Sequence, residues 1–184
     1  MRHLIETDRL RLKVLDESSA DLVLAYYIDN KAFLHPWEQT RHDVFYSKDA
    51  QELSLKLDYD AALKGDMIRY WIFLKSTDEL IGSIALTNII RGIFKSCYMG
   101  YKLSEKHVRQ GYMVEACRAL IDIAFKDMLL HRIEANIMPN NLASIRVVSK
   151  LGFGFEGFSP EYLKINGKWE GHNRFALINR HLDE

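Results

Sequence analysis

The sequence has little of several features that mark particular classes of protein. Its 184 residues carry 25 Lys and Arg against 25 Asp and Glu, which gives a formal net charge of zero. Proteins that bind nucleic acids generally need a surplus of basic residues to displace counterions, so we expect no direct nucleic-acid binding. The longest unbroken apolar run, Leu22–Ile28, is far shorter than the roughly 20 residues that span a bilayer, so we expect no membrane segment.

Cysteine and histidine form no informative pattern either. Cys97 and Cys117 are isolated, and the seven His residues make neither an HxxxH nor an HExxH motif. The sequence therefore predicts no metal site. Two unpaired cysteines favour a reduced, cytoplasmic setting in which both behave as small buried apolar residues. The N-terminal residues lack the apolar core of a signal peptide, which agrees with that setting.

What the chain does contain is typical of a globular protein. Apolar residues make up 48% and charged residues 27%, and a chain of this length can bury one large core. Three Pro and ten Gly are spread along it without a repeat, a low-complexity tract or a linker. We therefore predict a single domain over residues 1–184. The sequence does not decide between a monomer and a homodimer.

The periodicity of apolar residues predicts a mixture of strands and helices. Strands are predicted at Leu10–Val14, Arg69–Leu74, Leu80–Leu86, Cys97–Leu103, Arg132–Ile137, Phe153–Gly157 and Arg174–Ile178. Helices are predicted after Asp16 or Ser18 with Leu22, Ala25 and Tyr26 inside, from Ser47 to Gly65 with Ala50, Leu53, Leu57 and Ala61 inside, from Gly111 to about Met128, and at Leu142–Leu151. This order lacks strict strand–helix alternation, so we expect a mixed α/β sheet and not a doubly wound parallel fold.

The segment Val108–Glu115 joins a predicted strand to a predicted helix and has a glycine at the turn. Such a turn exposes main-chain N–H groups at a helix N-terminus, where an anion is favoured. Gly111 lets a phosphate approach the main chain, and Arg109 adds positive charge beside it. This segment has neither a GK[ST] nor a GxGxxG pattern, so it is neither a P-loop nor a dinucleotide-binding fingerprint. Since a glycine at such a turn also has a purely conformational explanation, this segment alone does not establish a phosphate site.

A second segment, residues 136–153, runs from a strand through Pro139 to a helix and ends at Leu151-Gly152-Phe153. Asn141 is placed to cap that helix. Ser144 lies one turn further along the helix, so its hydroxyl can share the mouth of the same cleft.

In this order the two segments resemble the GNAT superfamily of acyl-CoA-dependent N-acetyltransferases, and the resemblance covers nearly the whole chain. Other stretches resemble the Rim-type branch of the superfamily, and more specifically its ribosomal-protein-alanine N-acetyltransferase subfamily. These stretches are residues 6–12, 30–38, 88–94, 97–101 and 162–169.

The resemblance implies a single-domain α/β (α+β) GNAT fold, with a mixed, mostly antiparallel central sheet flanked by helices. It places a V-shaped split between the fourth and fifth predicted strands, Cys97–Leu103 and Arg132–Ile137. The implied cosubstrate is acetyl-CoA, lying in that split with its pyrophosphate on main-chain N–H groups, and no metal is implied. The residues that the resemblance assigns to cofactor binding are Tyr101, Leu103, Arg109, Gln110, Gly111, Tyr112, Met113 and Asn141.

For catalysis, the resemblance implies direct attack of an amine in a ternary complex, with Ser144 assisting the departing thiolate. Many relatives place a Glu on the fourth strand as general base, but Tyr98 stands there in this chain. Removal of the proton by a water relayed through Tyr98, Asn141 or a carbonyl therefore stays open. Val108 and Met113 also depart from the family pattern, which usually has Gln or Arg and then Gly or Ala at these positions.

The acceptor is less well defined than the cofactor. An α-amine with a pKa of about 7.7–8.0 is partly neutral near pH 7, whereas a Lys side chain with a pKa near 10.4 is not. The N-terminus of a protein, in particular a ribosomal protein, is therefore the first hypothesis. A small-molecule amine, or an acyl-CoA-binding module without turnover, are the alternatives. Trp37, Asn88 and Arg91 are candidates for the acceptor side, although packing or the shape of a hairpin would also explain them.

Overall fold

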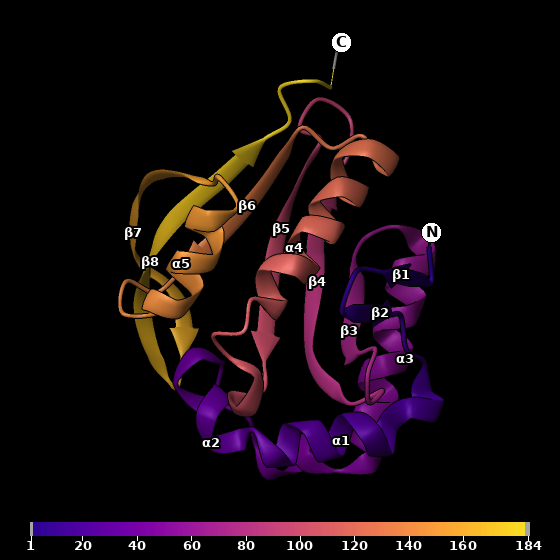
Figure 1. Cartoon of the computed structure of the whole chain (residues 1–184). Coiled ribbons are helices and arrows are strands. Elements are labelled where there is room, and N and C mark those ends of the chain that lie inside the picture. The colour runs from indigo at the N-terminus through magenta and orange to yellow at the C-terminus, as the bar shows by residue number, and fades with distance from the viewer. Residues whose placement is uncertain (1, 183–184) are drawn as a thin grey trace.

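The computed structural model describes residues 2–182, and Figure 1 shows the arrangement of the elements. The strands are β1 (Leu4–Glu6), β2 (Leu10–Lys13), β3 (Ile68–Leu74), β4 (Leu80–Ile90), β5 (Ser96–Leu103), β6 (Arg132–Ile137), β7 (Gly154–Ile165) and β8 (Lys168–Ile178). The α-helices are α1 (Ala20–Asp29), α2 (Lys31–Leu34), α3 (Lys48–Lys64), α4 (Tyr112–Asp122) and α5 (Leu142–Lys150). Shorter helical turns are η1 (Glu17–Ser19), η2 (His35–Trp37), η3 (Asp43–Tyr46), η4 (Glu105–His107) and the π-helical η5 (Ile123–Asp127).

All of these strands belong to one sheet with the order β1-β2-β3-β4-β5-β6-β8-β7. Every neighbouring pair is antiparallel apart from β5 and β6, which run parallel. A parallel pair needs a long crossover connection, and α4 lies in that connection. The predicted mixed, mostly antiparallel sheet is therefore confirmed, and the short strand β1 is an addition to it.

The parallel pairing of β5 and β6 is short. It joins Ser96–Tyr98 of β5 to Arg132–Glu134 of β6, whereas β5 continues to Leu103 and β6 to Ile137. Beyond Tyr98 the two strands diverge, as Figure 1 shows, and the facing edge of β5 has no strand partner in the described chain. The predicted V-shaped split between these strands is therefore present.

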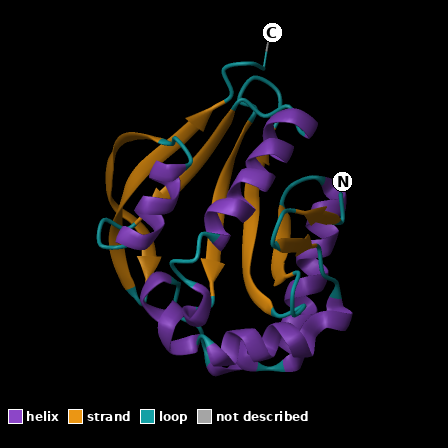
Figure 2. Cartoon of the chain, viewed as in Figure 1, coloured by secondary structure: helices purple, strands orange, loops and turns teal. Residues whose placement is uncertain are grey.

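Helices cover both faces of the sheet. On the first face, Ile133 and Ala135 of β6 share one apolar cluster with Ala116 of α4 and Val148 of α5. Figure 2 shows α4 and α5 lying in front of the strands on this face. On the second face, α1 and α3 pack against β4 and β3, and the buried Trp71 belongs to a separate cluster.

The buried face of α3 differs from the prediction. Ser47 caps the helix and Gly65 ends it, as predicted. However, the side chains of Leu53 and Leu57 are exposed, whereas Leu55 is buried. The helix carries leucines on more than one stripe, so apolar spacing alone does not select the stripe that packs against α1 and β3.

The same ambiguity affects α1. Tyr26 is buried as predicted, but Leu22 and Ala25 are exposed, and Val23 and Tyr27 take their places against the sheet. The aromatic rings of Tyr26 and Tyr27 each lie 5.9 Å from the ring of Trp71, which fixes the rotation of the helix.

The last two strands are longer than predicted. β7 begins one residue after the predicted Phe153 and continues to Ile165, and β8 begins at Lys168, well before the predicted Arg174. β7 is an edge strand with many exposed residues, so it lacks the apolar alternation by which a half-buried strand is found. Its Pro160 is tolerated because an edge strand needs no N–H group on its open side.

The start of α4 is tied to the connection between β1 and β2. Glu115 accepts hydrogen bonds from Thr7 Oγ1 at 2.6 Å and from the main-chain N–H of Arg9 at 2.8 Å. Its other carboxylate oxygen lies 2.7 Å from Arg9 Nε. Burial alone would raise the pKa of Glu115, but these hydrogen bonds and the charge of Arg9 together lower it. A charged tie between segments 106 residues apart therefore holds the first turn of α4.

The buried face of α3 can be tested with two leucines. Leu55→Ala should lower the free energy of unfolding by about 2–5 kcal/mol, because it leaves a cavity under the helix. Leu57→Ala, the matched control on the exposed side, should change it by less than about 0.5 kcal/mol. Urea denaturation measures both values, and equal losses would contradict the observed face.

The tie at Glu115 predicts a pH-dependent stability. Glu115→Gln should lower the free energy of unfolding at pH 7 by about 1–3 kcal/mol, the range for hydrogen bonds to a charged group. The folded-state pKa lies below the ordinary value of 4.5. The ionised carboxylate therefore stabilises the fold fully above pH 4.5 and loses this effect as the pH falls through the lowered pKa.

Urea denaturation between pH 7 and pH 3 measures this difference. The gap between the parent and Glu115→Gln should shrink in the acid range, whereas Glu105→Gln, at an exposed position, serves as the control and should change stability little at any pH. A gap that stays constant down to pH 3 would contradict the role of the ionised carboxylate.

Candidate active site

The loop before α4 presents main-chain N–H groups at the start of the helix. Gly111 is the N-cap residue with a φ of 83°, and no side chain within residues 2–182 caps this end of α4. Arg109 also has a positive φ, of 63°. Left-handed residues in such turns bring N–H groups to one side, and the helix dipole adds to their attraction for an anion. The geometry of residues 109–113, where the cofactor pyrophosphate is predicted, suits a phosphate group.

Arg9 braces this loop from the β1–β2 connection. Its guanidinium donates to the main-chain carbonyl of Gln110 at 3.0 Å and lies 4.5 Å from the centroid of the Tyr112 ring. The side chain of Gln110 donates in turn to the carbonyl of Lys106 at 3.1 Å. Arg9 and the exposed Arg109 both place positive charge at the loop. Arg9 was not predicted as a site residue, because its partner lies 101 residues further along the chain.

The unpaired part of β5 leads into this loop. Tyr101 and Leu103, predicted to lie along the pantetheine arm, are both half-buried there. The Tyr101 hydroxyl donates to the main-chain carbonyl of Ser144 at 3.0 Å and so links β5 to α5 across the split. Burial raises the pKa of Tyr101 well above its ordinary value, so this hydroxyl stays protonated and acts as a donor.

The first turn of α5 lies at the same split. Asn141 caps the helix as predicted, because its Oδ1 accepts from the main-chain N–H of Ser144 at 3.1 Å. Ser144 itself is half-buried, and within the described chain its hydroxyl makes no hydrogen bond. The structure therefore brings Ser144, Asn141 and Tyr101 together, with the Ser144 hydroxyl free to act on a ligand.

On the second face, Tyr98 pairs with Glu134 in the last row of the β5–β6 ladder. Glu134 accepts from Arg132 Nε and from an Nη of Arg174, both at 2.9 Å. Burial would raise the pKa of Glu134, but the two arginines lower it overall. Glu134 is thus held as a carboxylate by two cations and is a poor proton acceptor, although it pairs with Tyr98.

Tyr162 of β7 joins this group. Asn136 Nδ2 donates to its hydroxyl at 3.1 Å, and its ring lies 5.6 Å from the ring of His172. Burial raises the pKa of Tyr162, and the Tyr98 hydroxyl beside it raises the pKa further. Tyr98 therefore faces a second tyrosine hydroxyl that Asn136 orients. No role was predicted for Tyr162 beyond its place in a stretch resembling the family.

Two of the predicted acceptor-side residues lie near one end of β4. Thr87 of β4 pairs with Tyr98 of β5. Asn88 is the next residue, in an irregular part of β4 where its φ is 49°. Asn88 therefore lies close to Tyr98. Arg91 lies in the exposed turn after β4. Its guanidinium approaches the end of α3, since a Cβ on Gly65 would lie 3.2 Å from Arg91 Nη2. Asn88 is thus near Tyr98, whereas Arg91 faces another part of the molecule.

Trp37 lies at the other end of β5. It is half-buried in η2, where the carbonyl of His35 accepts from Asn166 Nδ2 at 2.6 Å and so ties η2 to the β7–β8 turn. The next residue, Glu38, pairs with Lys102 near the end of β5. From Ser96 to Lys102 a strand rises roughly 20 Å, so the structure separates Trp37 from the other two candidates.

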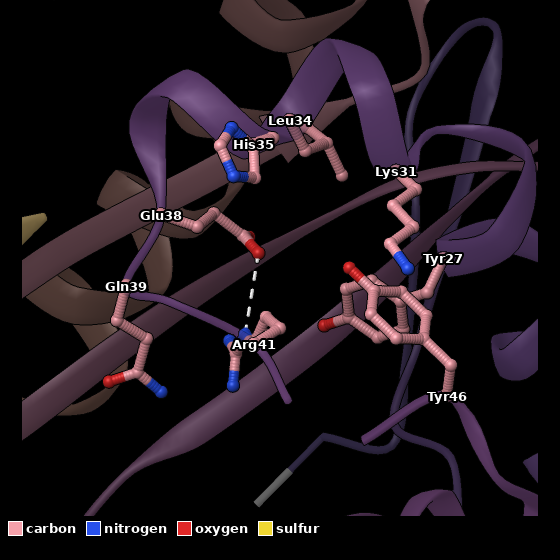
Figure 3. Close-up of a pocket in the computed structure, with 8 residues that line it drawn as sticks. All are labelled: Tyr27, Lys31, Leu34, His35, Glu38, Gln39, Arg41 and Tyr46. Atoms are coloured by element: carbon pink, nitrogen blue, oxygen red, sulfur yellow. Dashed lines mark ion pairs between the residues drawn. The ribbon is translucent and has the colours of Figure 1, made fainter. Parts of the chain in front are cut away.

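A polar pocket beside η2, shown in Figure 3, has no predicted counterpart. Glu38 lies between two cations: it contacts Lys102 Nζ and lies 3.5 Å from Arg41 Nε. The ring of Tyr27 also lines the pocket, and its centroid lies 5.1 Å from Lys102 Nζ. A larger cavity of about 260 Å³ adjoins this pocket and shares Tyr27, Gln39 and Arg41 with it.

The cysteines take no part in these sites. Both are free and buried, as predicted. Burial, followed by the charge of Glu134, raises the pKa of Cys97 to about 12, and burial also raises that of Cys117. Neither thiol is therefore ionised at neutral pH. Among residues 2–182 no group of His, Cys, Asp or Glu side chains is arranged to hold a metal ion. None of the helices in that range has the length and apolar character to cross a bilayer.

Comparison with known proteins gives a consistent picture. The acetyltransferase (GNAT) domain family matches residues 9–154. The ribosomal protein uS5-alanine N-acetyltransferase of Escherichia coli (strain K12) is 33% identical over 173 residues, which cover 94% of this chain and 89% of the relative.

Solved structures agree with this match. The ribosomal-protein-S5-alanine acetyltransferase from Vibrio fischeri superimposes with a TM-score of 0.92 at 29% identity, covering 98% of this chain and 99% of its own. RimJ of Mycobacterium smegmatis, solved in complex with CoA-disulfide, gives a TM-score of 0.88 at 25% identity and covers 95% and 84%. The chain therefore belongs to the GNAT family of N-acetyltransferases, among relatives of the Rim type.

Proposed function

We propose that this enzyme transfers the acetyl group of acetyl-CoA to the N-terminal α-amine of a protein, and that the acceptor is a ribosomal protein. The observation that carries the proposal is the open edge of β5 leading to the uncapped start of α4. The acceptor class is supported by the uS5- and S5-alanine acetyltransferases, and the cosubstrate by the CoA complex of RimJ. The proposal places the enzyme in the cytoplasm and treats residues 1–184 as one catalytic domain.

The residues of the split fit acetyl-CoA. The left-handed turn at Arg109 and Gly111 leaves the N–H groups of Gly111, Tyr112 and Met113 to bind the pyrophosphate. The free main-chain groups of Tyr101–Leu103 pair with the pantetheine arm as an added strand. When bound, acetyl-CoA supplies an activated acetyl group as a thioester. A main-chain N–H near Met99 polarises the thioester carbonyl, a type of contact worth roughly 2.7–4 kcal/mol.

The proton of the acceptor amine leaves on the second face. An α-amine with a pKa of about 7.7–8.0 is partly neutral at pH 7, so a strong base is not required. The acceptor amine is proposed to lie beside the Tyr98 hydroxyl of β5, which in turn lies next to the Tyr162 hydroxyl. Because the raised pKa keeps Tyr162 protonated, its hydroxyl accepts the proton from Tyr98 only while passing its own proton to solvent water, and Asn136 orients it for this relay.

The departing sulfur is handled on the first face. Ser144 lies at the start of α5, held to β5 by the hydrogen bond from Tyr101, and its free hydroxyl donates to the thiolate. The raised pKa values of Cys97 and Cys117 argue against a covalent acyl-cysteine step. The acetyl group therefore passes directly from cosubstrate to amine.

The cofactor site is tested by Gly111→Glu. A side chain at a φ of 83° is disfavoured, and its carboxylate repels the pyrophosphate, so CoA affinity should fall roughly 100-fold, or about 2.8 kcal/mol. Gly167→Glu is the matched control, because its φ of 79° carries the same backbone penalty in the β7–β8 turn. Isothermal titration calorimetry measures both. Unchanged CoA affinity in Gly111→Glu would refute this placement of the pyrophosphate.

The acceptor class is tested by thiol release from acetyl-CoA. Peptides that begin with Ala or Ser should support turnover, and blocking their α-amine should abolish it, because the unblocked amine is partly neutral at pH 7. Lysine-containing peptides with blocked N-termini and small polyamines serve as the comparison series. Faster turnover with a small amine than with any peptide would overturn the proposed acceptor.

A further inference from the structure

The larger cavity on the second face is lined by several charged side chains. It has a volume of about 260 Å³ and lies between α1, α3 and strands β3 and β5. Its charged lining residues are Arg41, Asp58, Arg69 and Lys102. None of these belongs to the predicted site, and none was assigned to cofactor binding above.

The charges around this cavity do not balance. Arg69 Nε lies 2.6 Å from Asp58 Oδ2, so this pair is neutral. Glu38 has to serve both Lys102 and Arg41, as described above. Three cations therefore share two carboxylates, and one positive charge is left over at the side of Arg41.

One polar atom of the cavity lining has no hydrogen-bond partner. Arg41 Nε is buried and makes no hydrogen bond within residues 2–182, although it lies 3.5 Å from an oxygen of Glu38, the carboxylate that also pairs with Lys102. A surplus cation with an unused donor suits an anionic, hydrogen-bond-accepting ligand.

An open path leads from the reaction centre to this cavity. Tyr98, Gly100 and Lys102 alternate with their neighbours on β5, so all three face the second side of the sheet. A Cβ on Gly100 would meet nothing within 4 Å, which leaves space for a chain to pass over it. Tyr98 and Lys102 are four residues apart, which is about 13 Å along a strand. Three or four extended peptide residues cover that distance.

We propose that the cavity selects acceptors with an acidic side chain at the third or fourth residue, bound by Arg41. This inference rests on the proposed function, because it takes the α-amine to lie at Tyr98. The ligand is the side-chain carboxylate of an acceptor peptide that runs over Gly100. The surplus positive charge at Arg41 offsets the free-energy cost of removing this carboxylate from water.

Equilibrium binding tests the proposal without turnover. Hexapeptides that begin with Ala carry a single Glu at position 2, 3, 4 or 5, each with a matched Gln peptide, and are titrated into the enzyme with CoA present. The Glu peptide should bind roughly tenfold more tightly than its Gln partner at position 3 or 4, and no more than about twofold at position 5. Equal affinities for Glu and Gln at every position would overturn the proposal.

Two variants assign the effect to the cavity. Arg41→Gln should remove the preference for Glu while leaving the affinity for Gln peptides nearly unchanged. Arg118→Gln, exposed on α4, is the control and should keep the full preference. A preference that survives Arg41→Gln would place the acidic side chain elsewhere and overturn the inference.

Acetyl transfer separates this inference from the proposed function. Turnover of Gln peptides without any preference for Glu refutes the cavity and leaves the function standing. Selective binding of Glu peptides without acetylation of any α-amine supports the cavity and refutes the function.

Discussion

The end of the parallel pairing between β5 and β6 is the constraint on which the rest of the site depends. After Tyr98 and Glu134 the strands separate, and the free edge of β5 becomes available to a ligand. Two interactions hold this fork. Arg132 and Arg174 fix Glu134 on the second face, and the Tyr101 hydroxyl spans the split to the carbonyl of Ser144 on the first. Side-chain interactions on both faces of the sheet therefore hold the split in place.

The two faces of the sheet carry different parts of the proposed reaction. On the first face, the loop before α4 and the start of α5 offer N–H groups, positive charge and the Ser144 hydroxyl. On the second face, Tyr98 and Tyr162 lie beside the fork, and the cavity at Arg41 lies further along β5. The chain is neutral as a whole, so its overall field attracts no partner over a long range. The proposed selection by charge therefore depends on local positive charge, at the loop before α4 and at Arg41.

Much of the fold and of the cofactor loop follows from local patterns. Gly111 at a strand–helix turn and Asn141 before the second crossover helix are recognisable because a cap or a tight turn needs a particular residue at a particular place. The paired residues that shape the site have no such signal. Arg9 and Glu115, or Glu38 and Lys102, are far apart in the chain, and only the packed fold brings them together.

The β6 strand shows where more could have been predicted. Arg132, Glu134 and Asn136 alternate with apolar residues, and this period of two already places them on one face of the sheet. Their partners, Arg174 and Tyr162, lie on strands whose length was underestimated, so the cluster around Tyr98 could not be assembled from the sequence. The stripe of α3 that packs inward was likewise decided by its neighbours, since leucines occupy more than one side of that helix.

Hydrogen exchange along β5 tests the central claim most directly. In the free enzyme, the amides of Met99–Leu103 that point away from β4 should exchange quickly, because no strand covers that edge. Binding of CoA should slow their exchange by roughly tenfold or more, while the amides of Ser96–Tyr98, already paired with β6, should change little. Slow exchange of Met99–Leu103 without CoA, or no protection when CoA is bound, would contradict the account.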